Sequence, residues 1–269
     1  MYAAGDSHDM LNIDDAPVTR NGNLLIVAYD HGLEHGPVDF EDVPESADPD
    51  RVFEVAQHDA VTALAVQKGV AETYYPEYED DVNLLVKLNG TSNLWQTEPY
   101  SPKNCTVEYA AELGADAVGY TMYAGSNREG EMFEEFREVQ EEARKHDLPV
   151  VMWAYPRGQA IKNDKKTGTI AYASRVGLEL GADVAKVKYA GTQGAMEEVV
   201  DVSGRMKVVM SGGSKKSDRA FLSDVHDTVS AGGHGLAVGR NVFQRDRPSR
   251  ILDKLEGVVF EGKGVDEVL

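Results

Sequence analysis

Short apolar runs that close on Gly or Asn alternate along the chain with longer amphipathic stretches. Four of these runs occupy residues 23–32, 83–90, 148–158 and 206–215, and four more occupy 58–69, 114–125, 181–191 and 232–241. They are apolar at consecutive positions and rich in β-branched residues, which is typical of parallel strands buried on both faces. The pattern therefore predicts eight buried strands.

Amphipathic helices are predicted between these strands, most clearly at 132–147 and 170–181. Eight strand–helix units at this spacing predict an α/β fold, a single (β/α)8 TIM barrel domain over residues 1–269, with an acidic N-terminal extension at 1–22 and a C-terminal helical segment at 245–269. A doubly wound open sheet is the competing fold. No G-x-G-x-x-G run follows a predicted strand, which argues against the dinucleotide-binding form of that fold.

Charge and cysteine content narrow the possible partners and the compartment. The 269 residues include 46 acidic and 27 basic side chains, for a formal net charge of −19. This balance argues against nucleic acid and anionic membranes as partners, and it resembles the surface of proteins from salt-rich, halophilic cytoplasm. A single cysteine, Cys105, excludes an intramolecular disulfide. Without a signal-peptide pattern or a membrane-spanning apolar run, we expect a soluble, cytoplasmic protein.

Polar side chains recur where the predicted strands end, which is where barrels of this kind carry their chemistry. The strand ends contribute Asp30 and His31, Lys87, then Trp153, Tyr155 and Arg157, then Lys186 and Lys188. In a chain short of cations, positive charge gathered at one face is expected to serve an anionic substrate.

The last two strand ends carry glycine-rich sequence at the recurrent phosphate-binding position of these barrels. Ser211, Gly212 and Gly213 follow the seventh strand, and Gly239 and Arg240 follow the eighth. Their backbone N–H groups could approach phosphate oxygens, and Arg240 would add charge. Ordinary turn glycines are the competing interpretation. Because both loops carry the pattern, we favour a phosphate site.

Lys186 and Lys188 lie two residues apart in a hydrophobic strand and therefore share one face. A free lysine has a pKa of about 10.4, which desolvation and neighbouring cations lower. We expect Lys186, Lys188 and Lys87 to lower one another's pKa, so that a neutral amine can attack a ketone and form a Schiff base. The position favours Lys186 as nucleophile and Lys188 as support, although a snorkelling or ion-paired lysine is the alternative. Tyr155 and Asp30 are available acids and bases.

The segment "HGLEH" at 31–35 matches the H-x-x-E-H pattern of inverted zinc peptidases. That chemistry needs a helix to bring His31 and His35 onto one face. Because the motif follows a strand directly, contains Gly32 and precedes Gly36 and Pro37, we predict a loop and no metal site.

Six segments taken together resemble the archaeal-type class I fructose-1,6-bisphosphate aldolases: "YDHGLEHGP", "LVKLNG", "WAYPRG", "AKVKYAG", "SGGSK" and "AVGRNVFQ". The likeness runs in order from about residue 24 to 247, and the acidic composition suggests a haloarchaeal member. The resemblance implies a lyase of glycolysis and gluconeogenesis that reversibly cleaves fructose 1,6-bisphosphate to dihydroxyacetone phosphate and glyceraldehyde 3-phosphate. It further implies a Schiff-base lysine, no metal or other cofactor, and homo-oligomers, commonly decamers of two pentameric rings.

The resemblance also assigns roles to individual positions. Lys186 matches the Schiff-base lysine, Tyr155 the general acid/base and Asp30 the catalytic acid. The positions matching substrate and phosphate contacts are Trp153, His35, Arg157, Ser211, Gly212, Gly213, Gly239 and Arg240. From their places at strand ends we expect His31, Lys87 and Lys188 to bind substrate as well.

Two alternative functions remain open at this point. One is 2-amino-3,7-dideoxy-D-threo-hept-6-ulosonate synthase of aromatic amino-acid biosynthesis, whose members resemble this chain less at "LEHGP", "LVKLNG" and "WAYP". The other is a non-catalytic phosphosugar-binding barrel, which would not need a lysine, a tyrosine and an aspartate on three separate strand ends.

Overall fold

Eight parallel strands close into a barrel in chain order, with β8 hydrogen-bonded to β1. This computed structural model describes residues 12–94 and 97–269. The strands are β1 (Leu24–Ala28), β2 (Ala63–Gln67), β3 (Leu84–Lys87), β4 (Ala117–Met122), β5 (Val150–Ala154), β6 (Val184–Val187), β7 (Lys207–Ser211) and β8 (Gly235–Val238). Each lies within one of the eight predicted runs, and the predicted (β/α)8 TIM barrel is confirmed.

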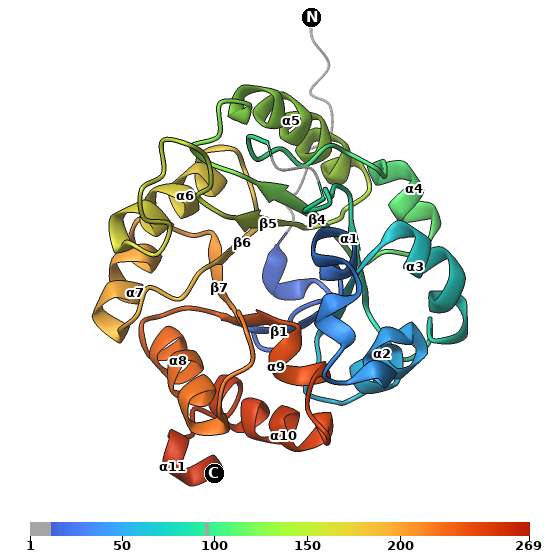
Figure 1. Cartoon of the computed structure of the whole chain (residues 1–269), viewed down its shortest axis with the longest axis vertical. Helices are drawn as coiled ribbons and strands as arrows, with labels where there is room; N and C mark the ends of the chain where they lie inside the picture. Colours follow the sequence, from blue (N-terminus) through green and yellow to red (C-terminus); the bar gives the residue numbers. More distant parts are fainter. Residues whose placement is uncertain (1–11, 95–96) are drawn as a thin grey trace, which may run out of the picture.

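Helices follow the strands, and all but two short ones at the mouth of the barrel, residues 31–35 and 240–243, form an outer ring (Figure 1). They are α1 (His31–His35), α2 (Pro49–Ala56), α3 (Lys68–Tyr74), α4 (Val107–Glu112), α5 (Glu129–Lys145), α6 (Thr167–Glu179), α7 (Gln193–Asp201), α8 (Asp218–Ser230), α9 (Arg240–Phe243), α10 (Pro248–Val259) and α11 (Val265–Val268). The helices predicted at 132–147 and 170–181 are α5 and α6, each beginning three residues earlier than expected. Across the described ranges, no helix is both long and apolar enough to cross a membrane.

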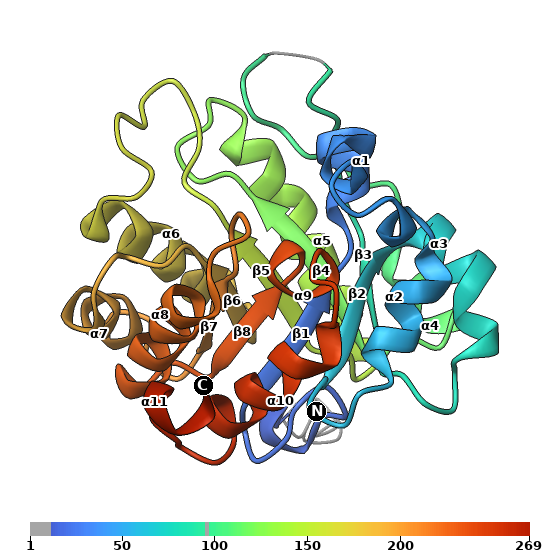
Figure 2. The same ribbon diagram turned by 60° about the horizontal axis from the view of Figure 1, so that its bottom comes forward.

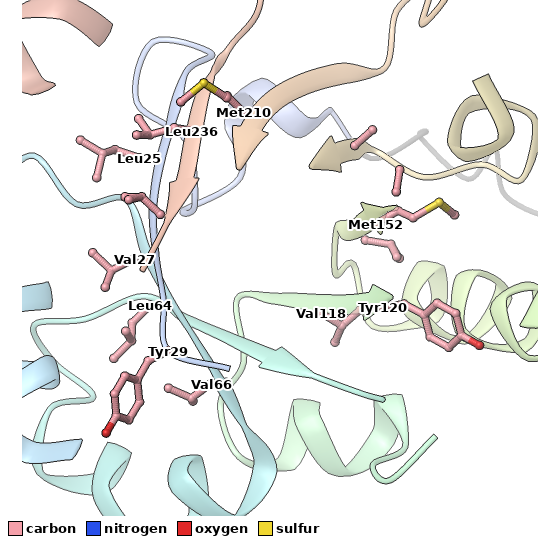
Figure 3. Packing of buried hydrophobic residues seen from close by; sticks show 14 of the residues in the cluster. Leu25, Val27, Tyr29, Leu64, Val66, Val118, Tyr120, Met152, Met210 and Leu236 are labelled. Atoms are coloured by element: carbon pink, nitrogen blue, oxygen red, sulfur yellow. The ribbon is translucent and has the colours of Figure 1, made fainter. Parts of the chain in front are cut away.

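Alternate residues of each strand feed two separate hydrophobic cores, as the two-residue period of a strand requires. Outward-facing side chains such as Leu25, Val27 and Leu64 pack against the helices (Figure 3). Inward-facing side chains fill the barrel, among them Leu24, Ile26, Ala63, Leu85, Val151, Trp153, Val184 and Val209. Both faces of the sheet are therefore buried, which explains why the strands read as continuous apolar runs.

The segment before β1 closes the barrel at the end opposite α1 (Figure 2). Ala16 and Val18 are buried in the same cluster as the barrel interior. Beside them, Asp14 forms an ion pair of 2.6 Å with Lys207, whose side chain is only 7% exposed at the start of β7. Residues 1–11 of the predicted acidic extension lie outside the described residues.

Residues 31–35 form helix α1, so the loop predicted for "HGLEH" is wrong. Gly32 is tolerated within this single helical turn. Gly36 ends it with a positive φ of 72°, and its N–H bonds to the Gly32 carbonyl. A 3-10 helix, η2 (Gly36–Phe40), follows directly, with Pro37 in its first turn. The glycine and proline therefore terminate the helix, as such residues commonly do, and do not prevent it.

Replacing Val18 by alanine tests whether the N-terminal segment contributes to the barrel core. Val18 is fully buried, so Val18→Ala should lower the free energy of unfolding by about 1–3 kcal/mol through lost burial and an unfilled cavity. Val38, which is 56% exposed, provides the matched control, and Val38→Ala should change it by less than about 0.5 kcal/mol. Denaturant unfolding at fixed salt measures both. Equal effects would show that the segment does not pack as described.

Candidate active site

A cavity of about 590 Å³ opens where the strands end, a size typical of small-molecule sites. Of the residues predicted for the site, those in its wall are Asp30, His31, His35, Trp153, Tyr155, Arg157, Lys186, Lys188, Ser211, Gly212, Gly213, Gly239 and Arg240. Lys87 is the predicted site residue that is not part of this wall. The barrel thus brings together side chains from five strand ends that are far apart in the sequence.

Lys186 lies on the inner face of β6 and is only 5% exposed, although it reaches the cavity. Burial lowers the pKa of its amine, and the negative charges of Asp30 and Glu34 partly oppose that effect. Its Nζ lies 4.6 Å from the centre of the Trp153 ring. The lowered pKa of Lys186 therefore comes chiefly from desolvation, which was one of the two predicted causes, and the neighbouring lysines that we also expected are not among its causes.

Lys87 approaches the same indole, with its Nζ 4.9 Å from the centre of the Trp153 ring. It contacts the backbone and side-chain oxygens of Asn89 at 3.1 and 2.9 Å and the Thr121 hydroxyl at 2.7 Å. Burial lowers the pKa of Lys87 to about 8, and the charge of Lys186 adds to the lowering. Oxygen contacts favour the ammonium form, so Lys87 is better suited than Lys186 to hold a proton. The structure places Lys87 against the same Trp153 ring as Lys186 and outside the cavity wall.

Gly119 in β4 makes room for this arrangement. A Cβ at position 119 would lie 2.7 Å from the Trp153 ring and 3.0 Å from the Lys87 side chain. Both separations are too short for unstrained packing, so a side chain here would displace the indole or the lysine. The sequence indicates this close packing, because a glycine inside an apolar strand often marks the close approach of another group.

Tyr155 and Asp30 face the cavity from opposite sides of the barrel. Burial raises the pKa of the Tyr155 phenol, Asp30 and Glu34 raise it further, and Arg157 lowers it. Asp30 occupies the N-cap position of α1, but its side chain makes no capping hydrogen bond. The Asp30 side chain therefore does not serve as the cap of this helix. Its carboxylate is available within the cavity wall.

The predicted substrate-binding cations that follow β5 and β6 each already have a carboxylate partner. Arg157 donates to Glu34 at 2.6 Å, and Lys188 forms an ion pair with Asp164 in the loop before α6. Because Asp164 balances its charge, Lys188 is ion-paired and not a second free amine. Glu34 is committed to Arg157, which gives the "HGLEH" glutamate a role outside any metal site.

Among the charged residues of the cavity wall, sequence reasoning missed four: Glu34, Lys165, Lys216 and Asp224. Glu34 was considered only as part of a zinc pattern. The two lysines belong to segments that follow β5 and β7, beyond the short strand ends on which the sequence analysis concentrated. A wider search for cations along these loops would have found them.

Asn241 fastens the loops after β7 and β8 to each other. It is fully buried, and its amide donates to the carbonyls of Gly212 at 2.8 Å and Ser214 at 2.9 Å. Its side-chain oxygen accepts from the Lys216 N–H at 2.8 Å. These bonds satisfy a buried amide and give both glycine loops one fixed shape, with Gly213 at a positive φ of 64°.

A buried amine, a phenol, a carboxylate and several cations in one barrel mouth define an enzyme that acts on an anionic carbonyl compound through a lysine nucleophile. Comparison with known proteins agrees with this class. The family model of DeoC/LacD family aldolases matches residues 24–245. The chain therefore belongs to this aldolase family, and the predicted resemblance to archaeal-type class I fructose-bisphosphate aldolases is confirmed.

Individual relatives make the relationship more specific. A protein named fructose-bisphosphate aldolase class 1 from Halobacterium salinarum is 64% identical and covers 97% of this chain and 99% of its own. A solved structure of a Schiff-base-forming fructose-1,6-bisphosphate aldolase is 44% identical with a TM-score of 0.87, covering 91% of this chain and 97% of that one. A 2-amino-3,7-dideoxy-D-threo-hept-6-ulosonate synthase from Archaeoglobus fulgidus is 36% identical over 94% of this chain and 92% of its own.

Removing the charge of Glu34 should move the pH dependence of Schiff-base formation to lower pH. The nucleophile is the neutral amine, and Glu34 holds the pKa of Lys186 higher than burial alone would leave it. Glu34→Gln also frees Arg157, whose positive charge acts in the same direction. We expect the acid limb of borohydride trapping with dihydroxyacetone to move to lower pH. The exposed Glu134, replaced by Gln, is the control and should leave the limb in place. An upward shift in Glu34→Gln would contradict this electrostatic account.

Proposed function

We propose that this protein is a class I aldolase that reversibly cleaves fructose 1,6-bisphosphate to dihydroxyacetone phosphate and glyceraldehyde 3-phosphate. The observation that carries the proposal is the buried Lys186 amine in the cavity, with Tyr155 and Asp30 in the same wall. The 64% identity to the Halobacterium aldolase, against 36% to the Archaeoglobus synthase, favours this substrate over the alternative. These side chains can supply all the chemistry that aldol cleavage needs.

The reaction follows from the protonation states of the three groups. Lys186, as a neutral amine, attacks C2 of the open-chain ketose, and Asp30 assists loss of water from the carbinolamine. The resulting iminium withdraws electrons as the C3–C4 bond breaks, while Tyr155 takes the proton of the C4 hydroxyl. In the free site the Tyr155 pKa is raised, so the phenol is protonated. The positive iminium offsets the carboxylates and lowers that pKa, so the phenol can pass its proton to the Asp30 carboxylate that remains after water has left. As a phenolate, Tyr155 then accepts the C4 hydroxyl proton and returns it to the enamine. Protonation of the enamine and hydrolysis then release dihydroxyacetone phosphate.

The substrate phosphates would bind the cations and the glycine loops of the cavity. The loops after β7 and β8, with Arg240, suit one phosphate, because backbone N–H groups and a guanidinium bind phosphate oxygens well. Arg157, Lys188 and Lys165 line the same cavity and could hold the other phosphate. His31, His35 and Trp153 complete the proposed substrate contacts. Lys87 lies outside the cavity wall and would act through the Trp153 ring that it contacts.

The enzyme is further proposed to work in a salt-rich cytoplasm, to form a homo-oligomer and to act in glycolysis or gluconeogenesis. The net charge of −19 and the 64% identity to a Halobacterium protein support the first point. In such a medium, concentrated counterions screen repulsion among the surface carboxylates.

Replacing Lys186 by methionine should abolish cleavage, lowering kcat by at least about 10³-fold because no other group can form the iminium. In the native enzyme, borohydride with substrate should leave a covalent adduct on Lys186, identified by peptide mass spectrometry. Cleavage should persist in EDTA. A non-catalytic binding barrel would instead show saturable binding, no turnover and no dependence on Lys186, and activity lost in EDTA but restored by zinc would indicate a metal-based reaction.

Replacing Tyr155 by phenylalanine should separate Schiff-base formation from bond cleavage. Without the phenol, proton transfer from C4 is impaired, and kcat for cleavage should fall by about 10²–10⁴-fold. Trapping of dihydroxyacetone phosphate on Lys186 should continue, since the amine and Asp30 remain. Loss of trapping together with cleavage would mean that Tyr155 acts at an earlier step.

A further inference from the structure

Asp39, in the 3-10 helix η2, is a largely buried carboxylate in a protein whose acidic residues mostly face solvent. Its side chain is 13% exposed. One oxygen, Oδ2, lies 2.5 Å from Nδ1 of His35 and 3.9 Å from Nε2 of His31. The other, Oδ1, accepts a hydrogen bond of 3.4 Å from Arg240. Burial raises the pKa of Asp39, but His35, Arg240 and His31 together hold it below its usual value.

All three partners of Asp39 line the cavity, whereas Asp39 itself is not among the described residues of the cavity wall. The carboxylate therefore lies directly behind groups that face a bound substrate. It also links segments 201 residues apart in sequence, because His35 follows β1 and Arg240 follows β8. The backbone strengthens this link, since the Gln244 amide donates to the Asp39 carbonyl at 2.5 Å.

Arginine has five N–H donors in a planar group, and the bond to Asp39 uses one of them. The remaining donors can bind an anion once the guanidinium is held in one orientation. In His35 the contact engages Nδ1, which leaves Nε2 as the nitrogen that a ligand can reach. Without Asp39, two long or mobile side chains would have to be ordered by the substrate itself, at a cost in binding.

We propose that Asp39 is a positioning residue that holds Arg240 and His35 in the orientation that binds a phosphate group of the substrate. It acts through these two side chains and does not touch the substrate. This inference rests on the proposed function in one respect, which is that the bound phosphate belongs to a sugar phosphate. The anion-binding role itself can be measured without turnover.

Asp39→Asn keeps the size of the side chain and removes its charge. We expect the dissociation constant for inorganic phosphate, measured by calorimetry on the full chain, to rise about 10-fold. KM for fructose 1,6-bisphosphate should rise similarly, with kcat changed less than about 3-fold. Asp42→Asn, an exposed change in the same segment, is the control and should match the native protein.

Two further measurements distinguish positioning from a general structural role. Borohydride trapping of dihydroxyacetone, a ketone without phosphate, should proceed in Asp39→Asn at the native rate. In an Arg240→Gln background, Asp39→Asn should weaken phosphate binding by less than about 3-fold, since most of its effect passes through Arg240. If Asp39→Asn is too unstable to assay, Asp39→Glu, which moves the charge by one methylene, should also weaken phosphate binding.

Unchanged or tighter phosphate binding in folded Asp39→Asn would overturn the proposal, because removing the carboxylate would then relieve repulsion and nothing more. So would equal losses in phosphate binding and in dihydroxyacetone trapping. A native protein that binds phosphate but cleaves no sugar bisphosphate would refute the proposed function and leave the role of Asp39 testable by calorimetry.

Discussion

The burial of one amine, that of Lys186, is the constraint on which the rest of this structure depends. An ammonium taken out of water without partners is unstable, so burial favours the neutral amine that the proposed reaction requires of Lys186. The barrel provides the necessary environment because its interior is filled by side chains from every strand. Trp153 covers the amine, Lys87 lies on the same ring, and Gly119 gives both of them room.

Closing the far end of the barrel serves the same purpose. The N-terminal segment places Ala16 and Val18 in the interior cluster, and the Asp14–Lys207 ion pair lies beside them. With that end covered, water reaches the barrel through the strand ends that carry the chemistry. The low polarity around Lys186 thus depends on residues more than 160 positions away in the sequence.

Binding an anion in a protein with a net charge of −19 requires cations that are concentrated and held in place. Four cations of the cavity wall each have a carboxylate partner: Arg157 with Glu34, Lys188 with Asp164, Arg240 with Asp39 and Lys216 with Asp224. These pairs fix long side chains before substrate arrives. They also keep the site from accumulating uncompensated positive charge, which would lower the pKa values of all its amines together.

The sequence by itself determined the eight strands, the barrel and most of the cavity wall. It could do so because a strand buried on both faces leaves a continuous apolar run, and because parallel strands bring their ends to one side. Local signals were enough to place Lys186, Tyr155 and Asp30 at that side. The same signals led to the wrong prediction for "HGLEH". Gly36 and Pro37 indicated a loop, whereas they follow directly on a short helix.

Only the tertiary structure decided which charges meet. Lys87 lies behind Trp153 and outside the cavity wall, Asp164 pairs with Lys188, and Asp39 joins His35 to Arg240. These contacts join elements that are far apart in the sequence, and they depend on side-chain orientations that the two-residue period of a strand does not encode. The lowered pKa of Lys186 also depends on the tertiary structure, because it results from burial by all the groups that pack around the amine.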